Sequence, residues 1–160
     1  MSDNEGNVIV VTGAGSGIGK ATVHRLANEG ASLLTFTFSG ARRVVPSYNV
    51  MGVSKAALEA SVKYLAMDLG PVGVRVNAIS SGPMRTLSGA AIGAGRSIYR
   101  WARANSALGR DLRSENVADA SLYLLSDLSR GVTGEIHYVA YGNSIIGISS
   151  RADPQADITS

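Results

Sequence analysis

The sequence predicts an α/β fold of three layers, in which helices cover both faces of a mostly parallel sheet. Short apolar runs rich in β-branched residues alternate with longer segments of helical periodicity. The first run, residues 8–11, is continuously apolar, which is typical of a strand buried on both faces of a parallel sheet. A glycine-rich turn then joins this run to a helical segment. About four strands are recognisable, so we expect a truncated sheet.

The expected strands and helices follow one another along the whole chain, with two helices in succession before the last strand. The expected strands are residues 8–11, 33–38, 74–79 and 135–139. The expected helices run from residue 18 to a C-cap at Gly30, from about 48 to 69, from 87 to about 108, and from 114 to about 125. Ser114 is the expected N-cap of the last helix, with Glu115 in its first turn.

The 160 residues are enough for one domain with a buried core. We expect this domain to span residues 1–150, as a β-α unit with the glycine turn (1–33) and a second half (34–150). Residues 151–160 lack apolar periodicity and are expected to form a flexible tail. The chain holds no run of ~18 apolar residues and begins with polar, acidic residues, so we expect a cytoplasmic protein that does not enter a membrane.

Composition excludes several kinds of chemistry. The chain has no cysteine, which excludes disulfides, thiolate catalysis and cysteine-bound metal. Its two histidines, His24 and His137, are isolated and cannot build a metal site alone, so no metal is expected. The net charge of +3 is too small to indicate a nucleic-acid partner.

The glycine turn has the context of a dinucleotide site. Its sequence TGAGSGIG, residues 12–19, lies between the first expected strand and the first expected helix. Glycines at such a turn let the backbone approach a pyrophosphate, whose charge the amides at the helix N-terminus stabilise. The alternative is that the glycines only permit a tight turn. The acidic or basic residue that usually follows ~20 positions later, at the end of the second strand, is missing, because the next acid after Glu29 is Glu59.

A tyrosine and a lysine form the second candidate site. Tyr48 and Lys55 are seven residues apart at the start of the expected helix 48–69, so they would differ by ~20° around its axis. Because helical side chains lean toward the N-terminus, the lysine can reach back toward the tyrosine. A cation near a phenol favours the phenolate and strengthens the phenol as a hydrogen-bond donor. The alternative is an aromatic residue at a helix start and a solvated lysine.

Four segments carry a resemblance to a known family. They read PSYNVMGVSKAALEA (46–60), GVRVNAIS (73–80), SGPMRTL (81–87) and LLSDLS (124–129). Together they resemble the enoyl-acyl-carrier-protein reductases of the short-chain dehydrogenase/reductase superfamily, in which six residues separate the catalytic tyrosine from the lysine. The resemblance covers residues 34–148, whereas the first 30 residues resemble short-chain dehydrogenases in general. It implies a Rossmann-like fold and a role in fatty acid biosynthesis.

The resemblance also implies roles for individual residues. Tyr48 would hydrogen-bond the carbonyl of a trans-2-enoyl thioester carried by acyl carrier protein, and Lys55 would hold the nicotinamide ribose. The cofactor would be NADH or NADPH, with NADH favoured. The implied cofactor-binding residues are Gly13, Ser16, Gly17, Ile18, Gly19, Lys55, Gly82, Pro83, Met84 and Thr86. The implied substrate contacts are Phe38, Tyr48, Met51 and Ile92.

The chain departs from the family pattern at three places. Phe38 stands where these reductases carry a second tyrosine, and residues 139–142 read Val-Ala-Tyr-Gly where the family tends to have an aspartate. About three strand-helix units are missing between Glu29 and Leu34, so the chain resembles a fusion with its junction near residues 32–35. Residues 8–11 must then pair directly with 33–38 or leave backbone groups to be satisfied elsewhere, and a homo-oligomer would cover such an edge.

Two alternative functions remain open. One is an NAD(P)-dependent carbonyl reductase of the wider superfamily, against which the six-residue gap between Tyr48 and Lys55 argues. The other is a catalytically silent remnant, or a partner subunit of a full-length homologue, which the missing strands favour. The silent remnant predicts no cofactor binding.

Overall fold

The structure is a computed structural model that describes residues 8–10, 32–84 and 95–148. Their main elements, in chain order, are β1 (Val8–Val10), β2 (Ser32–Phe38), α2 (Val50–Leu69), β3 (Arg75–Ser81), α4 (Gly95–Ala104), α5 (Ser114–Leu125) and β4 (Ile136–Val139). The order of strands and helices predicted for these parts of the chain is confirmed. The glycine turn, the helix expected after it, and the tail 151–160 lie outside the described residues.

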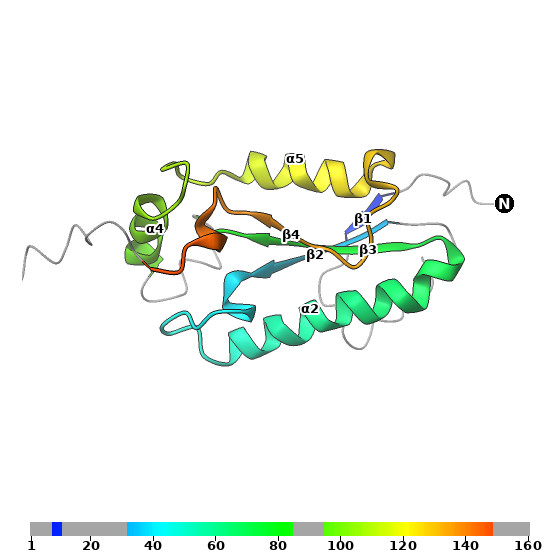
Figure 1. Ribbon diagram of the computed structural model, residues 1–160, viewed down its shortest axis with the longest axis horizontal. Coiled ribbons are helices and arrows are strands. Elements are labelled where there is room, and N and C mark those ends of the chain that lie inside the picture. Colours follow the sequence, from blue (N-terminus) through cyan, green and yellow to red (C-terminus); the bar gives the residue numbers. More distant parts are fainter. Residues whose placement is uncertain (1–7, 11–31, 85–94, 149–160) are drawn as a thin grey trace, which may run out of the picture.

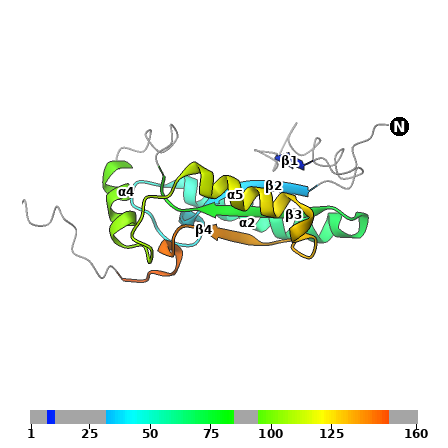
Figure 2. The same cartoon turned by 90° about the horizontal axis from the view of Figure 1, so that it is seen from above.

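The described strands form one parallel sheet in the order β1-β2-β3-β4, which Figure 2 shows from above. β1 pairs directly with β2, from Val8 opposite Ser32 to Val10 opposite Leu34. Of the two outcomes expected for the shortened chain, direct pairing is therefore the one that occurs. At the other end, Phe38 of β2 lies opposite Ser81 of β3. The carboxyl ends of neighbouring strands thus meet at one edge of the sheet.

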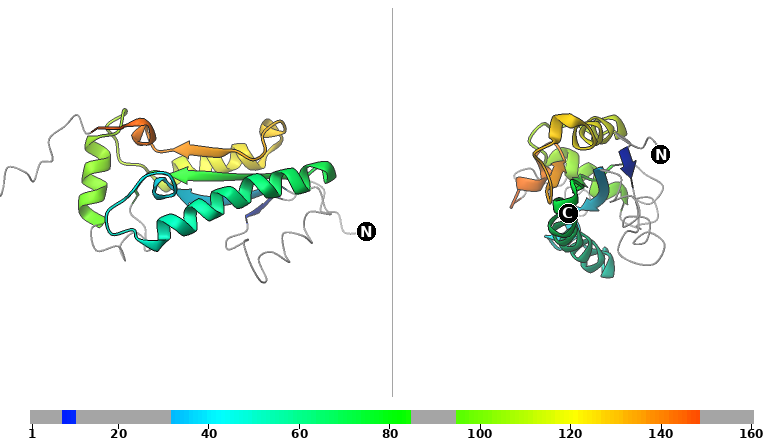
Figure 3. Two further views of the ribbon diagram at one scale, coloured as in Figure 1. Left: turned by 60° about the horizontal axis from the view of Figure 1, so that its bottom comes forward. Right: turned by 90° about the vertical axis from the view of Figure 1, so that its right-hand side faces the viewer.

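Helices cover both faces of the sheet, as predicted. α2 packs on one face and α5 on the other, which the end-on view in Figure 3 shows. Alternate residues of the strands serve the two layers. The buried residues of the α2 layer are Leu33, Val62, Ala66, Leu69, Val74, Val76 and Ala78. Those of the α5 layer are Leu34, Ile79, Val117 and Leu124.

Two polar side chains in the amino-terminal part of β3 hydrogen-bond the segments that surround that end of the sheet. Arg75 donates to the carbonyl oxygens of Leu124 (2.8 Å) and Ser126 (3.1 Å), where α5 ends, and to the hydroxyl of Ser32 (2.6 Å) on β2. The guanidinium therefore satisfies carbonyl groups that the end of a helix leaves unpaired. The second, Asn77, is fully buried and bonds the segment that leads into β4.

Three expected boundaries are wrong. α2 begins at Val50 and not near Tyr48, because Ser47 and Asn49 adopt positive φ angles (65° and 48°) that a helix does not contain. The N-cap of α5 is Arg113, and Ser114 is its first helical residue; Glu115 does lie in the first turn. The expected helix 87–108 is described only as α4, which ends at Ala104. None of the described helices is long and apolar enough to span a membrane.

Candidate functional site

The predicted site residues that the structure describes, apart from Met51, lie around the ends of β2 and β3. Loops and helices surround the carboxyl ends of the strands, with the β2–α2 loop, α4 and the C-terminal segment at the left of Figure 1. Phe38 ends β2, and Gly82 follows Ser81 at the end of β3. Since Phe38 and Ser81 are paired in the sheet, the two groups of predicted residues lie at neighbouring positions. Open parallel sheets bind their ligands at this edge.

Tyr48 lies in the loop before α2. Its amide donates to the carbonyl oxygen of Val45 at 3.1 Å, in a turn that follows from Pro46 and the positive φ of Ser47. Its ring meets the ring of Phe38 edge to face, with 5.2 Å between the centroids. The residue lines a cavity of about 490 Å³ formed by residues 40–49, 52 and 53.

Lys55 lies on α2, one turn and a half into the helix, and points back to β2. Its Nζ atom donates to the carbonyl oxygen of Phe36 at 2.8 Å. Tyr48 precedes the helix, so the expectation that both residues share one helical face is wrong. The loop and the helix nevertheless bring the tyrosine, Phe38 and the lysine to the same end of β2.

The electrostatics of the tyrosine also differ from the expectation. Burial raises the pKa of Tyr48, because the phenolate would lose hydration. Burial lowers the pKa of Lys55 for the corresponding reason. The lysine was expected to favour the phenolate, whereas burial shifts the pKa of Tyr48 in the direction that favours the protonated phenol. A protonated phenol is the form that donates a hydrogen bond.

Gly82, Pro83 and Met84 line a second cavity, of about 330 Å³, at the end of β3. A Cβ atom on Gly82 would lie 3.1 Å from the Cα and Cβ atoms of Ala140, which explains the glycine at this position. The opposite wall of the cavity comes from α4 and the start of α5. Both cavities have the size of small-molecule sites.

One of the predicted site residues is placed differently, and several others lie outside the described residues. Met51 is half exposed in the first turn of α2 and lines neither cavity. Thr86 and Ile92 lie outside the described residues, as do the predicted residues of the glycine turn, Gly13, Ser16, Gly17, Ile18 and Gly19. Within the described ranges, no cluster of His, Asp and Glu side chains is suited to a metal ion.

The structure adds one buried carboxylate that the sequence reasoning missed. Glu59 accepts hydrogen bonds from the hydroxyl of Thr37 and from Nε of Arg42, each at 3.0 Å. The residue is buried, although glutamates are rarely buried unless they are paired. Its spacing with the buried Val62 and Ala66, three and seven residues further along α2, is the signal that places it on the inner face.

Two further contacts were also missed. Arg43 donates to the carbonyl oxygen of Asn143 at 3.0 Å and to that of Ser144. The departure at residues 139–142 proves to carry its own polar anchor, since the hydroxyl of Tyr141 donates to Oδ1 of Asn116 at 2.8 Å. No short-range sequence pattern indicates either contact, because about 100 residues separate the arginine from its acceptors and 25 separate the tyrosine from its partner.

Comparison with known proteins agrees with this geometry. The family model described as enoyl-(acyl carrier protein) reductase matches residues 18–144. The chain belongs to this family. It is 60% identical over 120 residues to the NADH-dependent enoyl-acyl-carrier-protein reductase 2 of Rhizobium meliloti, covering 75% of this chain and 45% of that protein. It is 51% identical over 138 residues to reductase 1 of the same organism, covering 86% and 51%.

Solved enoyl-acyl-carrier-protein reductases share the fold. The enzyme of Anaplasma phagocytophilum, crystallised in complex with NAD, matches with a TM-score of 0.77 and 50% identity, over 83% of this chain and 51% of that one. The Bacillus cereus reductase with NADP⁺ and indole naphthyridinone matches with a TM-score of 0.77 and 50% identity, over 81% and 51%. The predicted Rossmann-like α/β fold is confirmed. The chain spans about half the length of the relatives that it matches.

Proposed function

We propose that the chain carries the carbonyl-polarising site of an enoyl-acyl-carrier-protein reductase. The reaction would be the NAD(P)H-dependent reduction of a trans-2-enoyl thioester on acyl carrier protein, in fatty acid biosynthesis and in the cytoplasm. The observation that carries the proposal is that Tyr48 and Lys55 both reach the end of β2, the tyrosine by its ring contact with Phe38 and the lysine by its bond to the carbonyl oxygen of Phe36. The paired end of β3 leads into Gly82 and Met84. The relatives named as NADH-dependent reductases favour NADH over NADPH.

The donors that are present fit a nicotinamide nucleotide. A lysine ammonium has three N–H groups, and the carbonyl oxygen of Phe36 accepts from Lys55 Nζ. Further N–H groups of this ammonium are suited to ribose hydroxyls, which accept hydrogen bonds. Met84 and Pro83 supply an apolar wall for a nicotinamide ring. When bound, the cofactor supplies a hydride to the β-carbon of the enoyl thioester.

Tyr48 would then act on the other end of the conjugated system. Hydride addition at the β-carbon drives negative charge onto the thioester oxygen. A preorganised hydrogen-bond donor at that oxygen lowers the activation free energy by a few kcal/mol (roughly 3). A tyrosine phenol is protonated at neutral pH, and burial raises the pKa of Tyr48 further in the same direction, so it is available as a donor. The ring of Phe38 packs edge to face against the ring of Tyr48. Phenylalanine keeps the shape of the family's second tyrosine at this position but donates nothing.

The test is a titration of the purified chain with NADH and, separately, with NADPH, followed by nicotinamide fluorescence and thermal shift. We expect saturable binding and then reduction of crotonyl thioester that Tyr48→Phe abolishes. Reduction of a keto substrate in place of the enoyl thioester would favour a carbonyl reductase. A chain that melts cooperatively and binds neither nucleotide would overturn the proposal.

The competing function is a silent chain that pairs with a full-length homologue. Its supporting observations are the half-length match to the relatives and the direct pairing of β1 with only the first part of β2. Such a chain would bind no nucleotide alone but would co-elute with a full-length reductase. Co-elution without nucleotide binding by the isolated chain is therefore the result that selects it.

We further infer that the chain forms a homo-oligomer through the outer face of α2. Exposed residues recur there with the alternating spacing of three and four that is typical of a coiled-coil seam: Val50, Val53, Ala57, Ala60, Tyr64 and Met67. The four large side chains among them are 71% to 77% exposed. The spacing of these residues, and the sequence of large and small side chains, is the same from either end of the helix. A second copy lying antiparallel would therefore place Val50 opposite Met67, with the two alanines where the helices cross.

Light scattering after size-exclusion chromatography tests this interface. We expect an oligomer that Val53→Glu converts to monomer, because a charge in the seam would be buried without a partner. Leu122→Glu is the matched control, since Leu122 is equally exposed but lies on α5. A monomeric wild-type chain would overturn the inference.

A further inference from the structure

The loop between β2 and α2 carries Tyr48 and holds two adjacent arginines that reach in different directions. Arg42 bonds Glu59 of α2 through Nε at 3.0 Å. The same carboxylate accepts from Thr37 on β2, and it is only 5% exposed. The guanidinium also lies over the ring of Tyr138 on β4, 5.9 Å from its centroid. Arg42 therefore links the loop directly to α2 and β4, and through the carboxylate of Glu59 to β2.

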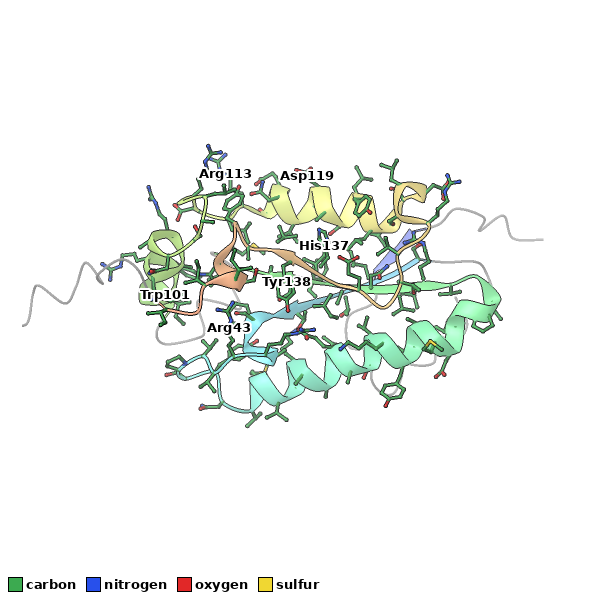
Figure 4. The ribbon with its side chains drawn as sticks, viewed as in Figure 1. Arg43, Trp101, Arg113, Asp119, His137 and Tyr138 are labelled. Carbon is green, nitrogen blue, oxygen red and sulfur yellow. The ribbon has the colours of Figure 1, made fainter. Side chains whose placement is uncertain are left out.

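Arg43 fastens the same loop to the C-terminal segment. Its guanidinium donates to the carbonyl oxygens of Asn143, Ser144 and Ile146. Figure 4 shows this side chain between the cyan loop and the orange C-terminal segment. Arg43 lines the cavity of Tyr48, whereas Asn143 lines the cavity of Met84. The arginine is thus a direct link between the two cavities.

We propose that Arg42 and Arg43 are positioning residues that hold the phenol of Tyr48 in place relative to Lys55 and to the cavity of Met84. Only the expected effect on the reaction rate rests on the proposed function; the position of the phenol does not depend on it. Neither arginine is assigned a contact with the substrate or the cofactor. They act through the loop, which they hold from its two sides.

The loop needs such anchors because its backbone is irregular. Ser47 and Asn49, on either side of Tyr48, adopt positive φ angles. Non-glycine residues keep such angles only where the surroundings impose them. Three carbonyl oxygens around one guanidinium need donors that are fixed in a plane, which arginine supplies and lysine does not. On the other side, Arg42 compensates the charge of a buried carboxylate, and breaking that pair would leave Glu59 uncompensated.

The experiment follows the ring of Tyr48 by NMR, with ¹³C-labelled tyrosine and the signal assigned from Tyr48→Phe. The variants are Arg43→Lys, Arg43→Gln and Glu59→Gln. We expect the Tyr48 signal to shift and its titration to move toward the ordinary pKa of tyrosine, because a released loop admits water. The expected order is a larger change in Arg43→Gln than in Arg43→Lys.

Arg75→Gln is the matched control for stability. Arg75 also bonds several carbonyl oxygens, but it lies at the opposite end of the sheet from Tyr48. We expect this variant to lower the melting temperature and to leave the Tyr48 signal and titration unchanged. If Arg75→Gln and Arg43→Gln move the Tyr48 titration equally, the arginines act through stability alone and the proposal is overturned.

The kinetic readout separates this inference from the proposed function. We expect Arg43→Lys to lower kcat for crotonyl thioester about tenfold with little change in KM, since a misplaced donor weakens the transition state more than binding. A wild-type chain without activity would contradict the proposed function, and the Tyr48 titration would still decide the positioning role. An unchanged Tyr48 titration in both Arg43 variants would refute that role whatever the activity.

Discussion

A methyl group added at Gly40 tests how strongly the reaction rate depends on the position of the Tyr48 ring. A Cβ atom on Gly40 would lie 2.6 Å from Cδ1 and 2.7 Å from Cε1 of the tyrosine ring. Carbon atoms in contact prefer ~3.5 Å, so Gly40→Ala must displace the ring by roughly 0.9 Å. Gly40 has no positive φ angle, so the backbone itself accepts alanine. Among the described residues, the only close contact is therefore with the tyrosine ring, since the next atom, Cδ1 of Phe38, lies at an ordinary contact distance of 3.4 Å.

A displacement of about 1 Å in a reacting group can lower the rate by ~100-fold. We expect Gly40→Ala to lower kcat for crotonyl thioester by roughly 10- to 100-fold. The melting temperature should change by only a few degrees. Gly131→Ala is the control, because no atom lies within 4 Å of its added Cβ. Equal kcat values for the two variants, together with an unshifted Tyr48 NMR signal, would refute this reasoning.

Three other predictions concern stability and pH. Asn77→Ala removes a fully buried amide that donates to Val132 at 3.0 Å, and should lower the free energy of unfolding by about 3 kcal/mol in urea titrations. Gly142→Ala should cost about 2 kcal/mol by the same assay, because Gly142 has φ of 83° and its Cβ would lie 2.6 Å from that of Ala107. Folding raises the pKa of Tyr48, so its contribution to stability is complete below pH ~10 and is lost as the pH rises through the folded-state value. The unfolding free energy of wild type relative to that of Tyr48→Phe should therefore fall as the pH rises above ~10, the ordinary pKa of tyrosine, and a difference that does not change with pH would contradict the burial of the phenol.

Local patterns sufficed for the elements that carry the site. Short runs rich in β-branched and aromatic residues predicted β2, β3 and β4 to within two residues, because such side chains favour the extended backbone of a strand. Gly70 and Pro71 predicted the end of α2 for an equally local reason, since proline cannot continue a helix. The start of α2 escaped prediction, because the positive φ angles of Ser47 and Asn49 are imposed by the loop around them.

The sequence by itself determined the α/β class, the order of the described elements and the candidate pair Tyr48 and Lys55. Tertiary structure decided how the two residues reach the end of β2, Tyr48 from the loop and Lys55 through the carbonyl oxygen of Phe36, and not along one helical face. It also decided the direction of the tyrosine pKa, since burial depends on residues distant in the chain. The two anchors of the loop likewise depend on contacts across 17 and about 100 residues. Spacing along a chain reports neighbours on one element, whereas desolvation and long-range hydrogen bonds exist only once the elements have packed.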